Sequence, residues 1–317
     1  MEVVRCIDTY SIFKRAVSLT GWAFGRDAPI TSMALRFPGG REYPLQAPEL
    51  PSGDVAAAHG PIAAKCRFDA QIIVNEPHDH LLQAELIFKG DLGQQVVVTE
   101  LTRLSPAEST HWLEEKFRQQ LAGKADGRYL EVGSRARSGI TRRGVAPPSW
   151  QYVGLDVLPG ENVDVVGDAH QLSRLFQGVR FDAVAAFSVL EHILMPWKFI
   201  VELNRTLNTG AVGLFTTHQC WPVHDAPWDF WRFSDTAWAA LFNQATGFEI
   251  IQTALGERGH VVAAHCHTAT HFGDIPGGYL SSAVMFRKIG ETTLDWPVRV
   301  EDITSTLYPD QVQDIRL

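Results

Sequence analysis

The chain has few cysteines, and their arrangement excludes a cysteine-based scaffold. Its four cysteines, Cys6, Cys66, Cys220 and Cys266, are scattered through 317 residues and form no C-x-x-C pair. This usage indicates reduced thiols and predicts a cytoplasmic protein. The chain also lacks an apolar run long enough to span a bilayer. Residues 1–5 lack the layout of a signal peptide.

Positive charge is scarce as well. The net charge is −8, from 28 Lys and Arg against 36 Asp and Glu. A nucleic-acid-binding protein usually carries a basic patch, and only one short group of arginines is visible here: Arg135, Arg137, Arg142 and Arg143. We interpret this group as the solvated face of a short helix, with a local anion site as the alternative. We therefore expect no nucleic-acid partner and no membrane span.

Residues 1–103 lack a convincing helical pattern. Short β-rich runs, such as 17–24, 33–37, 81–88 and 95–101, are separated by Gly, Pro and Asp turns, and several alternate apolar and polar residues. This pattern predicts an immunoglobulin-like β-sandwich. Nothing in it has a catalytic pattern. We expect an accessory domain that offers a surface for a protein partner or a second copy of the chain.

The remainder of the chain alternates predicted strands and helices. We place the domain boundary near Leu104, an α/β domain over 104–290 and a C-terminal tail over 291–317. The alternation predicts a doubly wound α/β sheet of seven strands. Helices are predicted after Ser105, from Pro196 and after Asp235. The strands are predicted near residues 128–132, 151–156, 163–166, 181–187, 211–217, 248–255 and 280–287.

Two of these strands end in residues suited to an adenosine-containing ligand. Strand 128–132 runs into Gly133, and strand 151–156 ends in Asp156. The carboxyl ends of neighbouring parallel strands lie side by side, so a ligand there meets a tight glycine turn and a carboxylate that accepts hydrogen bonds from a ribose diol. A dinucleotide site prefers G-x-G-x-x-G, and Arg135 stands where the second glycine clears space for a pyrophosphate. This disfavours an NAD-linked oxidoreductase.

The run Glu131-Val132-Gly133-Ser134-Arg135 resembles motif I of class I S-adenosylmethionine-dependent methyltransferases, in an E-x-G-S-R form similar to bacterial, type 11-like members. Gly167-Asp168-Ala169 and the Leu-Glu-His ending of 181–192 follow in the family's order, so the resemblance covers about 125–290. It implies S-adenosylmethionine as cofactor, with Glu131 at its amino-acid end and Asp168 near its adenine. The implied cofactor contacts are Glu131, Gly133, Ser134, Arg135, Asp156, Val157, Asp168, Ala169, Ser188 and Glu191.

The segment 216–233, after the fifth predicted strand, is dense in histidine, tryptophan and proline. It should overhang the mouth of the pocket. His218, His224 and His192 are candidate general bases, with bracing of the loop as the alternative for each. A strand end holds geometry better than a loop, so we favour His218 as the base and His224 as an orienting group. Trp228, Asp229, Trp231 and Arg232 are candidate acceptor contacts; the aromatic pair equally suits a small loop core, and Asp229 and Arg232 equally suit pairing with each other.

A second histidine-rich segment spans 260–271 and contains His260, His265, Cys266, His267 and His271. A metal needs three or more converging ligands. Sugar O-methyltransferases of this general fold that use magnesium bind it mainly through carboxylates, whereas imidazoles dominate here. We predict no metal site and interpret the segment as a polar loop near the substrate.

These inferences predict O-methylation of a sugar or related small molecule, in surface glycan or secondary metabolite synthesis. The glycan assignment is an analogy, since the fold hosts many acceptors. The alternative from another class is a non-catalytic, methyltransferase-like scaffold that binds partners through its β-sandwich. The intact set of Glu131, Gly133, Asp156 and the loop histidines favours catalysis.

Overall fold

The computed structural model describes residues 1–99, 101, 110–137, 139–259 and 278–304. The chain divides into two compact units, Met1–Ser105 and Pro106–Leu317. The predicted boundary at Leu104 and the histidine-rich segment 260–271 lie outside the described residues. Within the described part of the chain, no helix is long and apolar enough to cross a bilayer.

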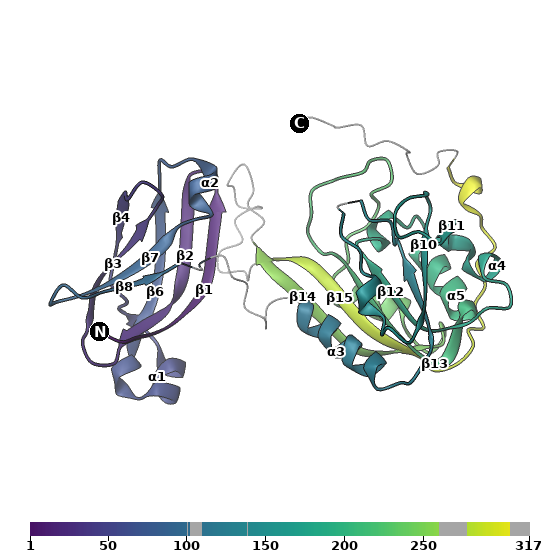
Figure 1. Ribbon diagram of the computed structural model, residues 1–317, viewed down its shortest axis with the longest axis horizontal. Helices are drawn as coiled ribbons and strands as arrows, with labels where there is room; N and C mark the ends of the chain where they lie inside the picture. The colour runs from purple at the N-terminus through teal and green to yellow at the C-terminus, as the bar shows by residue number, and fades with distance from the viewer. Residues whose placement is uncertain (100, 102–109, 138, 260–277, 305–317) are drawn as a thin grey trace, which may run out of the picture. The chain divides into compact units, whose positions relative to one another are not determined.

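The N-terminal unit contains two antiparallel four-stranded sheets (Figure 1). One has the strand order β1-β2-β6-β5 and the other β4-β3-β7-β8. The strands are β1 Val3–Phe13, β2 Ala16–Gly25, β3 Ile30–Arg36, β4 Glu42–Leu45, β5 Leu50–Pro51, β6 Lys65–Ile73, β7 Glu85–Gly90 and β8 Gln95–Val98.

Alternate side chains from the two sheets meet in one core. The i, i+2 spacing of these residues puts them on one face of each strand. The cluster includes Val17 and Leu19 of β2, Met33 and Leu35 of β3, and Leu86 and Phe88 of β7. Two short helices, α1 (Gly53–His59) and α2 (His78–Leu81), also belong to this unit, although the sequence pattern predicts none there. The immunoglobulin-like sandwich stays a prediction.

The C-terminal unit contains one seven-stranded sheet of order β11-β10-β9-β12-β13-β15-β14. Neighbouring strands from β11 to β13 are parallel, and β15 runs antiparallel between β13 and β14. All seven predicted strands are present, so the predicted α/β sheet is confirmed. The strands are β9 Arg128–Val132, β10 Gln151–Asp156, β11 Val165–Val166, β12 Phe181–Phe187, β13 Leu207–His218, β14 Phe248–Gly259 and β15 Gly278–Lys288.

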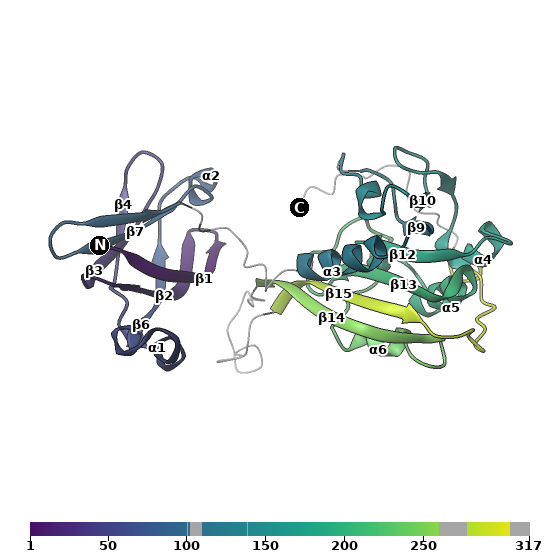
Figure 2. The same cartoon turned by 60° about the horizontal axis from the view of Figure 1, so that its bottom comes forward.

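Helices cover both faces of this sheet, as the doubly wound prediction requires. In β9, Leu130 and Val132 pack into the cluster shared with α4, α5 and α6, whereas Tyr129 packs into the cluster shared with α3. Figure 2 shows α3 and α6 on opposite sides of the sheet. The helices predicted from Pro196 and after Asp235 are confirmed as α5 and α6. The bounds are α3 His111–Ala122, α4 Leu172–Leu175, α5 Pro196–Thr206 and α6 Ala237–Leu241.

The connection from β9 to β10 departs from the prediction. Its described residues contain no α-helix, only a 3-10 turn at Arg143–Val145. The short helix predicted for the arginine group is therefore wrong. The physical reason is that these arginines contact separate acids: Arg135 lies beside Asp156, and Arg137 pairs with Asp225.

The strand order creates a switch point between β9 and β12. The chain leaves β9 on one side to build β10 and β11, and then returns to the other side of β9 with β12. In doubly wound sheets, ligands bind outside the carboxyl ends of the strands at such a point. The sheet topology therefore predicts where a site should lie.

We expect a chain that begins at Leu104 to fold without residues 1–103, because each unit has its own buried clusters. Its circular dichroism should be that of an α/β unit, and its thermal unfolding should be cooperative. A matched fragment that begins at Lys124 lacks α3, and should lose cooperativity because Leu113, Phe117 and Leu121 are all fully buried. Aggregation or non-cooperative melting of the longer fragment would refute its independence.

Candidate functional site at the sheet switch point

A cavity of about 640 Å³ lies at this switch point. Its volume is in the range of small-molecule and cofactor sites. Its wall is formed by the carboxyl ends of β9, β10 and β12, by residues after β11, and by the loop that follows β13. Among the ten predicted cofactor contacts, only Glu191 does not line it. The other nine line the cavity: Glu131, Gly133, Ser134, Arg135, Asp156, Val157, Asp168, Ala169 and Ser188.

Gly133 allows the end of β9 to pass close to the residue after β12. Its φ is +74°, and an added Cβ would lie 2.1 Å from Cγ2 of Val189. The N–H groups of Gly133 and Ser134 both donate to the carbonyl of Leu155, which ties the ends of β9 and β10 together. Ser134 lines the cavity, but its hydroxyl oxygen is buried against Gly154 and makes no hydrogen bond within the described residues.

Asp156 holds its carboxylate at the cavity wall through backbone contacts. Oδ1 accepts a hydrogen bond from the N–H of Leu158 at 3.0 Å, and Oδ2 accepts one from the N–H of Arg135 at 3.3 Å. The Nε of Arg135 lies 3.5 Å from Oδ1. Each carboxylate oxygen has two lone pairs, so Asp156 keeps capacity to accept hydrogen bonds from a diol.

Two further acids border the cavity in different environments. Burial raises the pKa of Glu131, and a 2.5 Å hydrogen bond from the Tyr152 hydroxyl offsets part of this rise. Burial also opposes ionisation of Asp168, but hydrogen bonds from the His170 ring and N–H outweigh it and lower the pKa of Asp168. The Nε2 of His170 accepts from the N–H of Met195, so its Nδ1 carries the proton donated to Asp168.

Glu191 organises the loop that follows β13. Its carbonyl accepts hydrogen bonds from the N–H groups of Phe230 and Trp231, at 2.8 and 3.2 Å. Its carboxylate is fully buried: Oε2 accepts from the Thr217 hydroxyl at 2.6 Å, and Oε1 lies 3.1 Å from Nε2 of His218. Burial opposes ionisation, but the contacts with His218 and Thr217 outweigh it and hold the pKa of Glu191 below its usual range.

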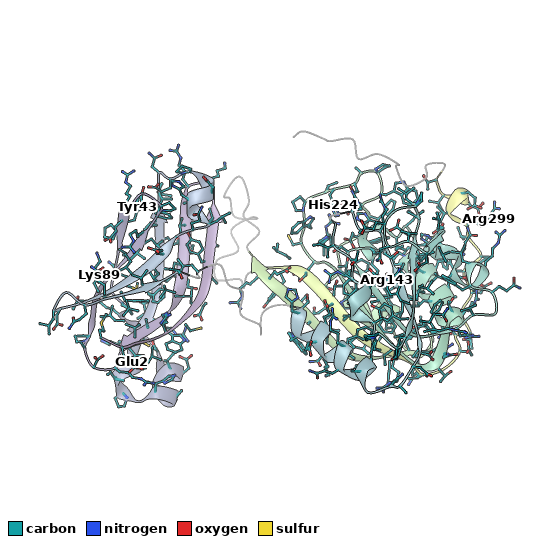
Figure 3. The ribbon with its side chains drawn as sticks, in the orientation of Figure 1. Glu2, Tyr43, Lys89, Arg143, His224 and Arg299 are labelled. Atoms are coloured by element: carbon teal, nitrogen blue, oxygen red, sulfur yellow. The ribbon has the colours of Figure 1, made fainter. Side chains whose placement is uncertain are left out.

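Of the three candidate bases, His192 and His224 line the cavity and His218 does not. The Nδ1 of His192 donates to the carbonyl of Trp228, and its Nε2 lies 4.0 Å from Oε1 of Glu191 and 4.0 Å from Oδ2 of Asp225. His224, labelled in Figure 3, lies on the loop after β13 with Nδ1 3.2 Å from the carbonyl of Pro222. His218 faces Glu191 instead, and its ring stacks on Trp221 at 4.8 Å.

The candidate acceptor contacts divide in the same way. Trp228 lines the cavity, whereas Asp229, Trp231 and Arg232 do not. Asp229 and Arg232 pair with each other through hydrogen bonds of 2.5 and 2.8 Å, one of the two predicted alternatives. Burial opposes ionisation of Asp229, but these bonds and one from the His224 N–H lower its pKa to about 2. This pair therefore braces the loop.

Sequence reasoning missed several cavity residues. Arg137 and Asp225 form an ion pair across 88 residues, and this pair joins the β9–β10 connection to the loop after β13. Val300, from the predicted tail, packs against Met195 and Trp228 and also lines the cavity. The arginine group was visible in the sequence, but no local signal pairs Arg137 with Asp225 or brings Val300 to the site.

No protein-family model and no curated protein matches the chain. The chain is distantly similar to solved structures. The YcgJ protein from Bacillus subtilis is 16% identical over 57% of this chain and 99% of its own, with a TM-score of 0.42. The N-methyltransferase NodS from Bradyrhizobium japonicum is 15% identical over 57% and 96%, with a TM-score of 0.36.

A coclaurine N-methyltransferase bound to N-methylheliamine and SAH is 9% identical over 56% of this chain and 70% of its own, with a TM-score of 0.40. These likenesses are too distant to assign an activity. The function proposed below therefore rests on the cavity's own residues.

Replacing Gly133 by Ala should destabilise the C-terminal unit by about 1–3 kcal/mol, because it adds left-handed backbone strain and an overlap with Val189. In a Val189→Ala background the overlap with Cγ2 is removed but the strained φ remains, so the added cost should fall without vanishing. Urea unfolding of the unmodified chain, the two single variants and the double variant measures this double-mutant cycle. Equal costs in both backgrounds would show that the close approach to Val189 has no energetic role.

Proposed function

We propose that the C-terminal unit is an S-adenosylmethionine-dependent methyltransferase that acts on an oxygen of a sugar or related small molecule, in surface glycan or secondary metabolite synthesis. The observation that carries the proposal is the cavity at the switch point. Its wall combines the tight turn at Gly133 with the carboxylates of Asp156 and Asp168. These are the kinds of group that a nucleoside with a charged amino-acid end requires.

The residues around the cavity fit this cofactor part by part. Asp156 would accept hydrogen bonds from the ribose diol, and Asp168 with Ala169 would face the adenine. Glu131 and Ser134 would face the amino-acid end. When bound, the cofactor supplies a methyl group on a sulfonium, which is transferred by in-line displacement. The chain's own task is to align the acceptor and take its proton.

The same cavity is poorly suited to a dinucleotide. A pyrophosphate is usually held at the N-terminus of a helix that follows the first strand. The described residues after β9 contain no α-helix before β10, and Arg135 places its side chain beside Asp156. We therefore expect S-adenosylmethionine or S-adenosylhomocysteine to bind, and NAD not to bind.

His192 is the residue to which we now give the base role. It lines the cavity, and its bond to the Trp228 carbonyl orients the ring with Nε2 as the basic nitrogen. His218 was favoured from its position at a strand end, but its Nε2 faces the buried carboxylate of Glu191. We assign His218 to positioning and His224 to the acceptor side of the cavity.

The alternative is a scaffold that keeps the fold and lacks turnover. Such a protein would bind the cofactor weakly or not at all, and no acceptor would release S-adenosylhomocysteine from it. The packed, braced loop over residues 219–233, with Glu191 and Asp229 both buried and paired, favours a site organised for chemistry.

Replacing Asp156 by Ala should weaken S-adenosylhomocysteine binding about tenfold or more, since a charge-assisted hydrogen bond is worth about 1.5–3 kcal/mol. Asp156→Asn retains one acceptor oxygen for the backbone N–H groups and should show an intermediate loss. Asp126→Ala, an exposed acid outside the cavity, is the control and should bind as the unmodified chain does. Calorimetry with S-adenosylhomocysteine and with NAD measures all of these. Unchanged affinity in Asp156→Ala would reject this orientation of the cofactor.

Replacing His192 by Ala should lower turnover by roughly 10²–10⁴-fold once an acceptor is known, because the acceptor proton loses its base. Screening nucleotide sugars and simple glycosides for S-adenosylhomocysteine release identifies that acceptor. The pH profile distinguishes a base from a bracing residue: the acidic limb of the unmodified chain should disappear in His192→Ala. His59→Ala, exposed in the other unit, is the control. If the limb persists in His192→Ala and disappears in His224→Ala, the base is His224.

A further inference from the structure

A buried carboxylate and two imidazoles converge beside the cavity. Glu191 lies in the 3-10 turn Leu190–His192 after β12, His218 is the last residue of β13, and His224 is in the following loop. One possible ligand atom from each residue lies within 4.8 Å of those of the other two. The three residues come from separate segments, so the fold alone assembles them.

The two oxygens of the Glu191 carboxylate differ: Oε2 accepts a hydrogen bond, and Oε1 faces His218. Oε2 accepts the hydrogen bond from Thr217. Oε1 lies 3.1 Å from Nε2 of His218, but within the described residues it makes no hydrogen bond of good geometry. The His218 ring is the nearest cationic partner of this fully buried oxygen, and a metal ion shared by the two groups would satisfy it more fully.

The ring of His224 has outer contacts of the kind that orient a metal ligand, since its Nδ1 lies 3.2 Å from the carbonyl of Pro222 and 3.3 Å from Oδ2 of Asp229. The ring of His218 stacks on Trp221 with an interplanar angle of 13°. The backbone N–H of His224 donates to Asp229 at 2.8 Å. Asp229 lies near His224 as well and groups with His192 and His224, but its carboxylate is held by two hydrogen bonds from Arg232, whose positive charge opposes binding of a cation there.

We propose that Glu191, His218 and His224 bind one divalent transition-metal ion, of the zinc class, at the acceptor side of the cavity. Two imidazoles and one carboxylate are a ligand set used for catalytic zinc and for non-haem iron, whereas magnesium prefers oxygen ligands throughout. His224 lines the cavity, so the open side of the ion would face the bound acceptor. The sequence pattern predicted no metal site: Glu191 was predicted to contact the cofactor, and His218 and His224 were candidate general bases.

The role of the ion rests on the proposed function, although its binding does not. A hydroxyl of the acceptor bound at the open position would become more acidic. Its proton would pass to His192, its oxygen would form a bond to the methyl carbon, and the sulfur–methyl bond would break with the electron pair remaining on sulfur. No oxidant or reductant is required.

The test uses the full chain, freed of metal with a chelator and titrated with Co²⁺ alone. One equivalent should bind, with visible d–d absorption, and Zn²⁺ should displace it. Glu191→Gln and His218→Asn should each weaken Co²⁺ binding by at least about tenfold, because each removes a ligand. His224→Asn, at a partly exposed position, should do the same with less risk to folding.

Two matched controls separate this site from other histidines. His59→Asn removes an exposed imidazole in the other unit, and the double change His265→Ala with His267→Ala removes the second histidine-rich segment. Both should keep one equivalent of Co²⁺. Circular dichroism and thermal melting show whether each variant is folded. If Glu191→Gln or His218→Asn does not fold, His224→Asn provides the test of metal binding.

The inference is overturned if the folded, unmodified chain binds no Co²⁺, if binding survives in His224→Asn, or if it is lost only in the double control. Calorimetry with S-adenosylhomocysteine on the same samples keeps the two proposals apart. Cofactor binding without Co²⁺ binding would remove the metal site and leave the methyltransferase. Co²⁺ binding without cofactor binding would keep the metal site and reject the proposed methyltransferase.

Discussion

The burial of Glu191 is the constraint on which the rest of the site depends. A carboxylate with no solvent exposure is stable only when its oxygens and its surroundings are paired. Thr217 and His218 supply side-chain partners from the end of β13, and the Glu191 carbonyl receives the N–H groups of Phe230 and Trp231. One residue thus joins the end of β12, the end of β13 and the loop that follows. The loop's position over the cavity follows from these bonds.

The cavity itself exists because strand ends meet there and loops are joined across it. Gly133 lets the chain turn against Val189 where any side chain would overlap. The ion pair of Arg137 and Asp225 links the β9–β10 connection to the loop after β13. That connection has no α-helix in its described part, and this ion pair and the contact of Arg135 with Asp156 tie it to neighbouring segments.

The histidines at the site differ in the groups that orient them. His192 is oriented by a backbone carbonyl, whereas His218 is oriented by a carboxylate and a tryptophan ring. In the roles proposed above, His192 would take the acceptor proton and His218 would share a cation with Glu191. The neighbours of His192 and His218 in the fold, and not their residue type, distinguish the roles proposed for them.

The sequence by itself determined the seven strands and α5 and α6, because apolar periodicity and punctuation by proline and glycine are local signals. It also determined the strand-end residues Gly133 and Asp156, since parallel strands bring their carboxyl ends together whatever the loops do. Only the tertiary structure decided that the arginine group forms no helix, that His218 faces Glu191, and that Val300 reaches the cavity. Those outcomes depend on contacts between residues far apart in the chain. The local sequence pattern around either residue does not reveal such a contact.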